Sequence, residues 1–303
     1  KDVHPPLYYL YAKIFDFIFG YSIQIQKIAA IIPMTGVLIL GATTIRKKFG
    51  DIVALFFILF ISCVPCSMEF AVQVRMYTLA LFFVTMCGVY GYFAYEKGDK
   101  KDFIIFAITG LAAAYTHYWA LGAVIIITGF MFIAILIKRR KLLLKWFLAA
   151  VIMLCAYLPW LLVLLKQISS INGNYWIPYI TKMTIWQYFV WTFDSRIYPG
   201  LVYGFLIILM VAGVFLIKQV LMNKEKDADA VYGLICMLVP TFVVVIGVFV
   251  SKYILQSTIY RDQYVFPALG LLALFFAIGI SKINKVLLVE IMIFLLFAGG
   301  IQY

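Results

Sequence analysis

The stretch LGAVIIITGFMFIAILIKRRKLLLKWFLAAVIMLCAYL, residues 121–158, decides the fold class of this chain. Two long apolar runs flank four consecutive basic residues at 138–141. Neither run alternates apolar with polar residues, as a lipid-facing strand would, and each is long enough for a helix that crosses a bilayer. A helix also satisfies its own backbone hydrogen bonds in lipid. The stretch therefore predicts two membrane-spanning helices, near 118–137 and 144–165, joined by a short basic loop.

The composition of the whole chain points to the same class. Of the 303 residues, 66% are hydrophobic and 13% are charged, and the mean hydropathy is +1.05. A water-soluble core needs far less apolar surface, so we expect an all-α integral membrane protein with one transmembrane domain over residues 1–303. The net charge of +12 does not predict a nucleic-acid partner, because basic residues beside membrane spans mainly set topology.

Long apolar runs recur along the chain and predict a bundle of ten spans. The second run is short and ends at Pro65, and the fourth and fifth meet at YTHYW, residues 115–119, as a tight helical hairpin. The predicted spans are 23–45, 51–66, 76–95, 103–117, 118–137, 144–165, 200–218, 230–250, 263–280 and 286–303.

Basic residues are concentrated in every second loop between these spans. Those loops hold sixteen of the 25 Lys and Arg residues, and the other basic residues are spread singly over the opposite side. The positive-inside rule places the basic loops in the cytoplasm, beside membrane lipids, and both visible ends of the chain outside. The basic loops lie at 46–48, 97–101, 138–145, 218–226 and 281–285.

Residues 5–19 are too short and too polar for a span, and they are rich in Tyr and Phe. Pro5 and Pro6 suit the first turn of a helix, and Gly20 suits its end. Aromatic residues prefer the headgroup layer of a membrane. We therefore expect an amphipathic helix that lies along the outer surface of the membrane.

The longest outer loop, residues 166–199, contains Trp176, Trp186 and Trp191. Such a high content of aromatic residues is atypical of a disordered linker. A small interfacial helix or an ordered lid over the outer face is expected here.

Ten polar residues belong neither to the interior of a span nor to a basic loop. All of them lie at or near the outer ends of spans or in outer loops. Charged groups at membrane depth are costly and usually face a bundle interior or a wet cavity. Such a layer predicts a reaction site at a lipid–water boundary. Its members are Asp2, His4, Glu69, Gln73, Arg75, His117, Asp194, Arg196, Arg261 and Asp262.

Several of these residues also have structural interpretations. Arg75 and Arg261 could extend to lipid headgroups instead of binding a phosphate in a site. His117 could cap the helix hairpin, and Glu69 could pair with Arg75. Cys63 and Cys66 form a lone CxxC without the second pair of a zinc site, so packing at a helix end is the simpler interpretation, with a disulfide left open.

Four segments resemble one family in their order and spacing: DVHPPLYYL at 2–10, FAVQVRMYTLALFF at 70–83, YTHYWAL at 115–121 and YRDQYVFPALGLL at 260–272. They resemble the bacterial relatives of protein O-mannosyltransferases, a family that includes the aminoarabinose transferase of lipid A. These are polytopic glycosyltransferases of the GT-C fold. The resemblance covers nearly the whole chain.

The resemblance implies an enzyme that takes a sugar from a polyprenyl-phosphate donor at the outer face of the cytoplasmic membrane. The acceptor is a lipid, a protein or a polysaccharide, and the sugar is transferred with inversion. A carboxylate accepts the acceptor's proton, and cations stabilise the phosphate leaving group. No cofactor is certain, and a divalent metal, with Asp2 or His4 as a ligand, is left open.

On this resemblance each candidate residue has an expected role. Asp2 and Glu69 are the candidate catalytic carboxylates. Arg75 and Arg261 are expected to bind the donor phosphate, which suits the planar fork of arginine. The residues expected to contact the acceptor or the sugar are His4, Gln73, Tyr77, His117, Tyr118 and Trp176.

The sequence departs from the family in two places. Family members usually have a further span and an acid-bearing outer loop before the HPPL segment, whereas this chain begins at Lys1. We therefore expect that the segment with the principal base is missing from the visible sequence. Family members also often have an acid two residues before the Arg of the RMY segment, where this chain has Gln73, and Glu69 is expected to compensate.

Two other functions fit less well. A polysaccharide polymerase or ligase also uses polyprenyl carriers, but such an enzyme would have a very large outer loop rich in Arg and His. The longest outer loop here, at 166–199, contains one Arg, Arg196, and no His. A transporter would have titratable residues or broken helices near mid-membrane, and repeated halves. Most of the rare polar residues of this chain lie at one face instead.

Overall fold

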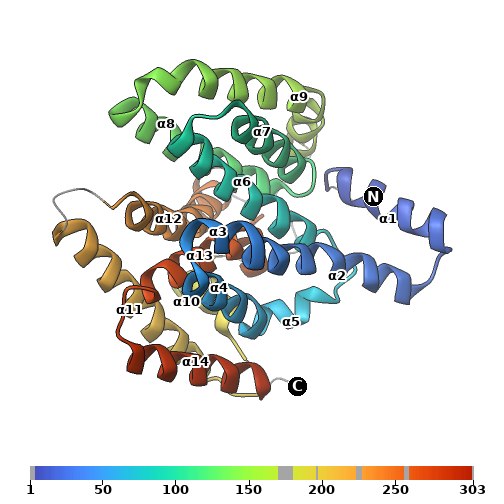
Figure 1. Ribbon diagram of the computed structural model, residues 1–303. Coiled ribbons are helices and arrows are strands. Elements are labelled where there is room, and N and C mark those ends of the chain that lie inside the picture. The colour runs from blue at the N-terminus through green and yellow to red at the C-terminus, as the bar shows by residue number, and fades with distance from the viewer. Residues whose placement is uncertain (1–3, 170–179, 196, 223–226, 256–258, 302–303) are drawn as a thin grey trace.

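The computed structural model describes residues 4–169, 180–195, 197–222, 227–255 and 259–301, and within these ranges the chain forms helices and turns without a strand (Figure 1). The predicted all-α class is confirmed. Every predicted span corresponds to a helix or a broken helix. These are α2 (Ile23–Leu40), continued by a π-turn and α3 (Arg46–Phe49), α4 (Asp51–Cys63) with α5 (Pro65–Ala71), α6 (Tyr77–Lys97), α7 (Lys100–Ala114), α8 (Tyr118–Lys138), α9 (Leu143–Ser169), α11 (Leu201–Met222), α12 (Ala228–Phe249), α13 (Leu269–Ile280) and α14 (Lys285–Gly300).

The number of helices able to cross a membrane differs from the predicted ten. Among the described residues seven are long and apolar enough, or eight if the bent pair α4 and α5 forms one span. α7 has 15 residues and α14 has 16. At about 1.5 Å per residue they are shorter than the roughly 30 Å of a bilayer core. The chain is a multi-pass membrane protein, but α7 and α14 do not meet the length of full spans.

Pro65 explains the break between α4 and α5. Proline cannot donate the backbone hydrogen bond that would continue a helix, and it favours an extended residue before it. Val64 is indeed extended, with φ −69° and ψ 131°, and the two helices meet at 69°. Cys63 and Cys66 lie on either side of the break as free, buried thiols.

The centre of the bundle is formed by α6 and α13, which the other helices surround (Figure 1). Every residue of α13 is buried, because the helix is apolar on all sides. Close approach to α6 depends on Gly270, where a Cβ atom would lie 1.9 Å from Oγ1 of Thr85. Small residues at such contacts let membrane helices pack backbone to backbone.

The predicted basic loops meet at one end of the bundle. Hydrogen bonds and ion pairs join loops that are far apart in sequence, so the alternation of charge corresponds to one shared face. The contacts are Lys48 with Glu96 and, at 3.3 Å, with Asp229, Arg139 Nη2 donating to the Glu96 carbonyl at 2.5 Å, Lys145 Nζ donating to the Gly98 carbonyl at 2.6 Å, and Lys282 with Asp227 at 3.7 Å.

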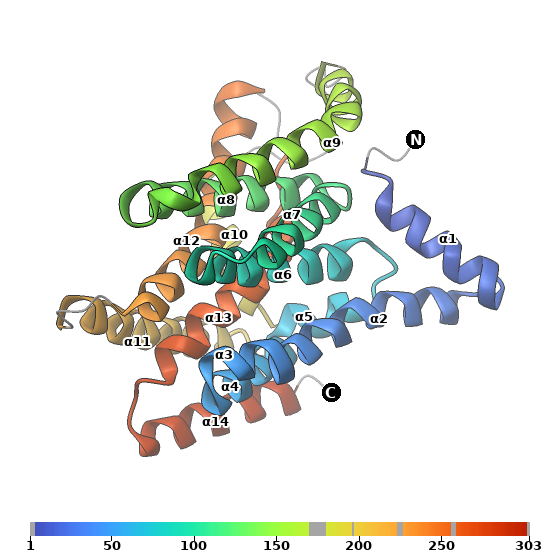
Figure 2. The same cartoon turned by 45° about the horizontal axis from the view of Figure 1, so that its top comes forward.

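Two helices lie outside the predicted spans, as expected. α1 (Leu7–Phe19) begins one residue after Pro6 and ends at Gly20, whose φ of 79° suits glycine. It projects from the side of the bundle with α2 (Figure 2) and exposes large apolar side chains such as Phe17. α10 (Lys182–Val190) is the helix expected in the aromatic outer loop.

Candidate active site

The segment before α1 lies on the turn between α7 and α8. Because Pro5 and Pro6 lack N–H groups, Leu7 supplies the first free donor after them, and its N–H donates to the Tyr115 carbonyl at 3.0 Å. The His4 ring stacks on the ring of His117, with centroids 5.4 Å apart and planes at 22°. The two histidines of the protein, 113 residues apart in sequence, are therefore neighbours.

His117 caps α8 from a buried position. Its Nδ1 accepts the Trp119 N–H at 3.1 Å, so the proton of the neutral ring belongs on Nε2. Nε2 is buried and makes no hydrogen bond within the described parts of the chain. The ring also contacts Tyr77 and Tyr264, at centroid distances of 5.6 and 5.2 Å. His117 thus satisfies the expected capping role and presents a spare donor among aromatic rings.

Burial, with a smaller contribution from the neighbouring His4, lowers the pKa of His117 to about 3. The unfolded chain, whose histidine has an ordinary pKa near 6.5, therefore binds more protons than the folded chain between these values. Stability is complete above about pH 6.5 and falls as the pH is lowered.

We expect that lowering the pH from 7 to 5 costs about 2 kcal/mol of unfolding free energy, a fall of a few degrees in Tm. His117→Asn keeps a side chain that can cap α8 and should remove most of this pH dependence. Thermal unfolding of both proteins at pH 5, 6 and 7 measures it. An equal fall in Tm for the variant would show that another group causes the effect.

Tyr77 is the point where the predicted cations converge. Its hydroxyl accepts a hydrogen bond from Gln263 Nε2 at 2.6 Å, which joins residues 186 positions apart. Arg75 and Arg261 both lie close enough for their charges to act on this hydroxyl, as does Asp262. Two arginines from distant connections are therefore within electrostatic reach of the same hydroxyl.

The two arginines differ in exposure and in neighbours. Arg75 is exposed, makes no ion pair within the described ranges, and also acts electrostatically on Tyr8 of α1. Arg261 is half-buried and acts on Tyr188 of α10 together with Asp262. Helices α1 and α10, far apart in sequence, thus each place a tyrosine within electrostatic reach of one of the arginines.

Arg261 is held by the residue before it. The Tyr260 side chain is fully buried, its N–H donates to Ser251 Oγ at 3.1 Å, and its carbonyl accepts from the Tyr188 hydroxyl at 3.1 Å. The Arg261 carbonyl in turn accepts the Tyr264 N–H at 3.0 Å. This network fixes the backbone on both sides of the arginine.

Gly247 of α12 makes room for the Tyr260 ring. A Cβ atom there would lie 2.1 Å from Tyr260 Cδ2, so Gly247→Ala must displace the ring that positions Arg261. We expect a loss of about 1–3 kcal/mol, the usual cost of overpacking, measured as a lower Tm. Gly129→Ala is the matched control, because nothing lies within 4 Å of a Cβ at that position. Equal Tm values for the two variants would contradict the role given to Gly247.

The other predicted residues are placed as follows. Glu69 is exposed near the end of α5, and no ion pair with Arg75 forms within the described residues, because the helix ends at Ala71 before Arg75 is reached. Gln73 has a buried Oε1 that accepts no hydrogen bond from any residue the structure describes. Tyr118 faces α9, where its hydroxyl donates to Gln167 Oε1 at 2.5 Å and accepts from Trp160 at 3.2 Å. Asp2 and Trp176 lie outside the described residues.

The sequence alone did not single out Gln263, Tyr264, Tyr188 or Tyr8 as site residues. Gln263 and Tyr264 follow Arg261 directly in the YRDQY segment, so that segment was the available signal. Tyr8 and Tyr188 carry no comparable signal, because tyrosine is abundant in this chain. As for a metal, no group of three His, Cys, Asp or Glu side chains suited to hold one occurs among the described residues. His4 and His117 are two adjacent imidazoles.

No family model and no curated protein sequence matches this chain. Two solved structures share its fold, both of ArnT from Cupriavidus metallidurans. The apo structure aligns with a TM-score of 0.65 and 14% identity over 96% of this chain and 52% of that one. The structure bound to undecaprenyl phosphate aligns with a TM-score of 0.60 and 15% identity over 93% of this chain and 50% of that one. This chain therefore has an ArnT-like GT-C fold and spans about half the length of the solved proteins.

Proposed function

We propose that this chain carries the donor site of a membrane glycosyltransferase that moves a sugar from a polyprenyl-phosphate donor to an acceptor. Its shared fold supports the proposal, because one of the solved ArnT structures holds undecaprenyl phosphate. The single observation that carries it is that Arg75 and Arg261, from two distant connections, both lie within electrostatic reach of the Tyr77 hydroxyl.

The phosphate of the donor is the group that this arrangement would bind. A leaving phosphate develops negative charge as the sugar departs, and positioned cations stabilise that charge. Arginine offers planar N–H donors that match phosphate oxygens. The polyprenyl tail would lie against the apolar helices, so no water-soluble nucleotide motif is needed.

The remaining residues receive roles by their place around the arginines. The buried Nε2–H of His117 and the amide of Gln263 could donate to sugar hydroxyls. A carboxylate accepts the acceptor proton, and among the residues of this chain we assign this role to Asp2 or Glu69. The resemblance implies inversion at the sugar. His4, Gln73, Tyr77, Tyr118 and Trp176 remain proposed contacts of the sugar or the acceptor, which is a lipid, a protein or a polysaccharide.

The reaction is proposed to occur at the outer face of the cytoplasmic membrane. The candidate residues lie at the ends of helices opposite to the shared basic face, and basic loops favour the cytoplasm. A cysteine introduced for Trp186 on the exposed side of α10 should react with an impermeant maleimide on intact cells, whereas one at Arg140 should react only after lysis. Cys155, the exposed native cysteine, is first replaced by serine. The reverse labelling pattern would overturn the orientation.

Donor turnover tests the proposed activity directly. The protein in lipid nanodiscs is incubated with synthetic undecaprenyl-phosphate-linked hexose, pentose and aminopentose, together with envelope extract as the acceptor source. Release of undecaprenyl phosphate, detected by mass spectrometry, is the expected result for at least one donor. The control is the Arg75→Ala, Arg261→Ala double variant, which should release none. No release from any donor, or equal release by the double variant, would contradict the proposal.

A further inference from the structure

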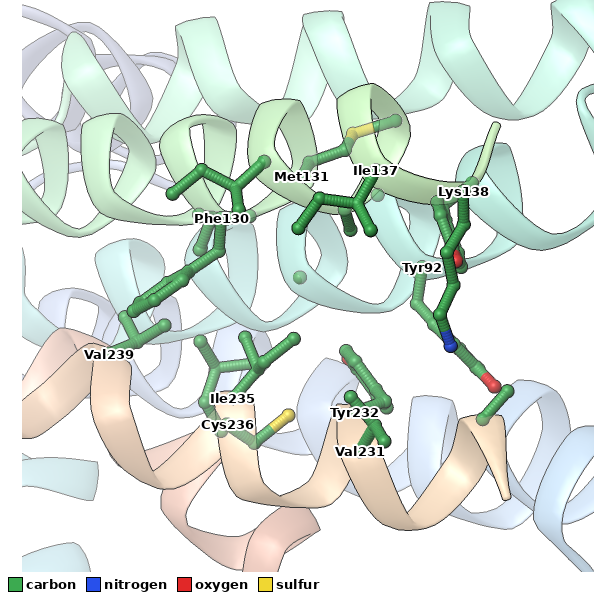
Figure 3. A pocket seen from close by; sticks show the side chains of 18 residues that line it. Tyr92, Phe130, Met131, Ile137, Lys138, Val231, Tyr232, Ile235, Cys236 and Val239 are labelled. Atoms are coloured by element: carbon green, nitrogen blue, oxygen red, sulfur yellow. The ribbon is translucent and has the colours of Figure 1, made fainter. Parts of the chain in front are cut away.

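A pocket separate from the candidate active site opens between α8 and α12, with α6 and α13 behind it. Its volume is about 270 Å³. Figure 3 shows Phe130 and Val239 at one end of the pocket and Lys138 and Tyr92 at the other. The lysine end lies at the shared basic face, because Lys138 is the last residue of α8. The pocket is therefore at the opposite end of the bundle from Arg75 and Arg261.

The depth of the pocket matches one leaflet of a bilayer. Along α12 its lining runs from Ala228 to Val239, and along α8 from Lys138 back to Ile127. Eleven residues of helix rise about 17 Å, close to half of the roughly 30 Å hydrocarbon core. Its volume is below the roughly 300–1,000 Å³ usual for a drug-sized ligand. A single extended chain fits such a space better than a folded, bulky molecule.

The polar groups of the pocket are gathered at its basic end. The Tyr232 side chain is 7% exposed. Figure 3 shows its hydroxyl pointing from α12 into the pocket. This hydroxyl makes no hydrogen bond to a nitrogen or oxygen atom of the residues that the structure describes. A nearby Cys236 thiol is a weak partner. Apolar side chains such as Phe130 and Ile127 form the deeper wall. This order, cation then hydroxyl then apolar wall, is that of a phospholipid's phosphate, ester and chain.

Lys138 is the basic residue that lines this pocket. Lys48, Arg139 and Lys145 all contact acceptors at this face. Lys138 makes no ion pair or hydrogen bond within the described ranges, although it lines the pocket. A positive charge at the mouth of an apolar pocket complements an anionic headgroup.

We propose that this pocket holds one acyl chain of an anionic phospholipid from the leaflet at the basic face, with Lys138 on its phosphate and the Tyr232 hydroxyl on an ester carbonyl. The donor's tail is the main competitor for the pocket. Its phosphate, however, is assigned to the arginines at the other end, so a cation at this mouth would serve no purpose for it. The choice of a phospholipid over the donor's tail rests on the proposed function, whereas the pocket and the cation at its mouth do not.

Native mass spectrometry of the detergent-purified protein tests the proposal, with phosphatidylglycerol and phosphatidylcholine as probes. The wild type should prefer phosphatidylglycerol. Lys138→Gln should weaken phosphatidylglycerol binding about fivefold, the effect of one Lys near an anionic lipid surface. The matched control Lys141→Gln removes an exposed charge from the same loop but lines no part of this pocket, and should bind as the wild type does.

A pocket-filling variant separates the two possible occupants. Ala134 lines the pocket, so Ala134→Trp should reduce binding of both phospholipids while undecaprenyl phosphate still binds. Equal behaviour of the Lys138 and Lys141 variants would overturn the proposal. Loss of undecaprenyl phosphate binding in Ala134→Trp, with phosphatidylglycerol binding intact, would also overturn it by assigning the pocket to the donor's tail.

Discussion

Replacing Arg261 by alanine is expected to lower the turnover of the cognate donor by about 100- to 1,000-fold, the usual cost of one preorganised donor in a transition state. The arginine is half-buried, and hydrogen bonds fix the backbone of the residues on both sides of it. A charge held in place before the reaction stabilises the leaving phosphate without reorganisation. The loss should therefore appear mainly in kcat.

Arg261→Lys separates charge from geometry. Lysine keeps the positive charge but lacks the planar fork, so we expect a turnover between that of the alanine variant and that of the wild type. Lys252→Ala, which removes an exposed cation at the corresponding end of α12, is the control and should keep wild-type turnover. If Arg261→Ala retains near-wild-type turnover with a normal Tm, the phosphate assignment of this residue is wrong.

Replacing Arg75 by alanine is expected to weaken turnover by about 10- to 100-fold, less than at Arg261, because exposed charges are screened by water and salt. Its neighbours Met76 and Tyr77 are buried, so the backbone is anchored while the side chain remains exposed. An exposed cation of this kind contributes mostly to capture of the anionic donor. The loss should therefore appear mainly in KM.

Salt dependence checks this difference between the arginines. Raising the ionic strength should increase KM for the wild type and change it much less for Arg75→Ala, because the screened charge is already absent. Steady-state kinetics at two salt concentrations measure the effect. An unchanged KM in Arg75→Ala at low salt would show that this arginine does not take part in donor capture.

Helix positions were predictable from the sequence because a membrane span must be long and apolar and must satisfy its backbone hydrogen bonds internally. The break at Pro65 followed from the chemistry of proline, and the tight turn at YTHYW followed from the short gap between two apolar runs. The lengths of α7 and α14 were predicted closely, at 15 and 18 residues against 15 and 16 in the structure. Ten spans were expected because runs this short were counted as spans, whereas seven or eight of the described helices are long enough to cross a membrane.

The candidate site was predictable only in part. The scarcity of charged groups outside the basic loops singled out Arg75, His117 and Arg261 before any contact was known. The hydrogen bond between Gln263 and Tyr77, and the space that Gly247 leaves for Tyr260, arise from contacts between distant segments. A single sequence contains no periodicity that reports such contacts. The pairing of Glu69 with Arg75, one of the alternatives left open by the sequence, does not form among the described residues, because α5 ends between them.

Direct binding of undecaprenyl phosphate tests the central claim that Arg75 and Arg261 together form a phosphate site. Titration of the purified protein, followed by native mass spectrometry, compares the wild type, the Arg75→Ala, Arg261→Ala double variant and the control Lys252→Ala. We predict that the double variant binds at least tenfold more weakly than the other two proteins. Equal binding by all three would contradict the account.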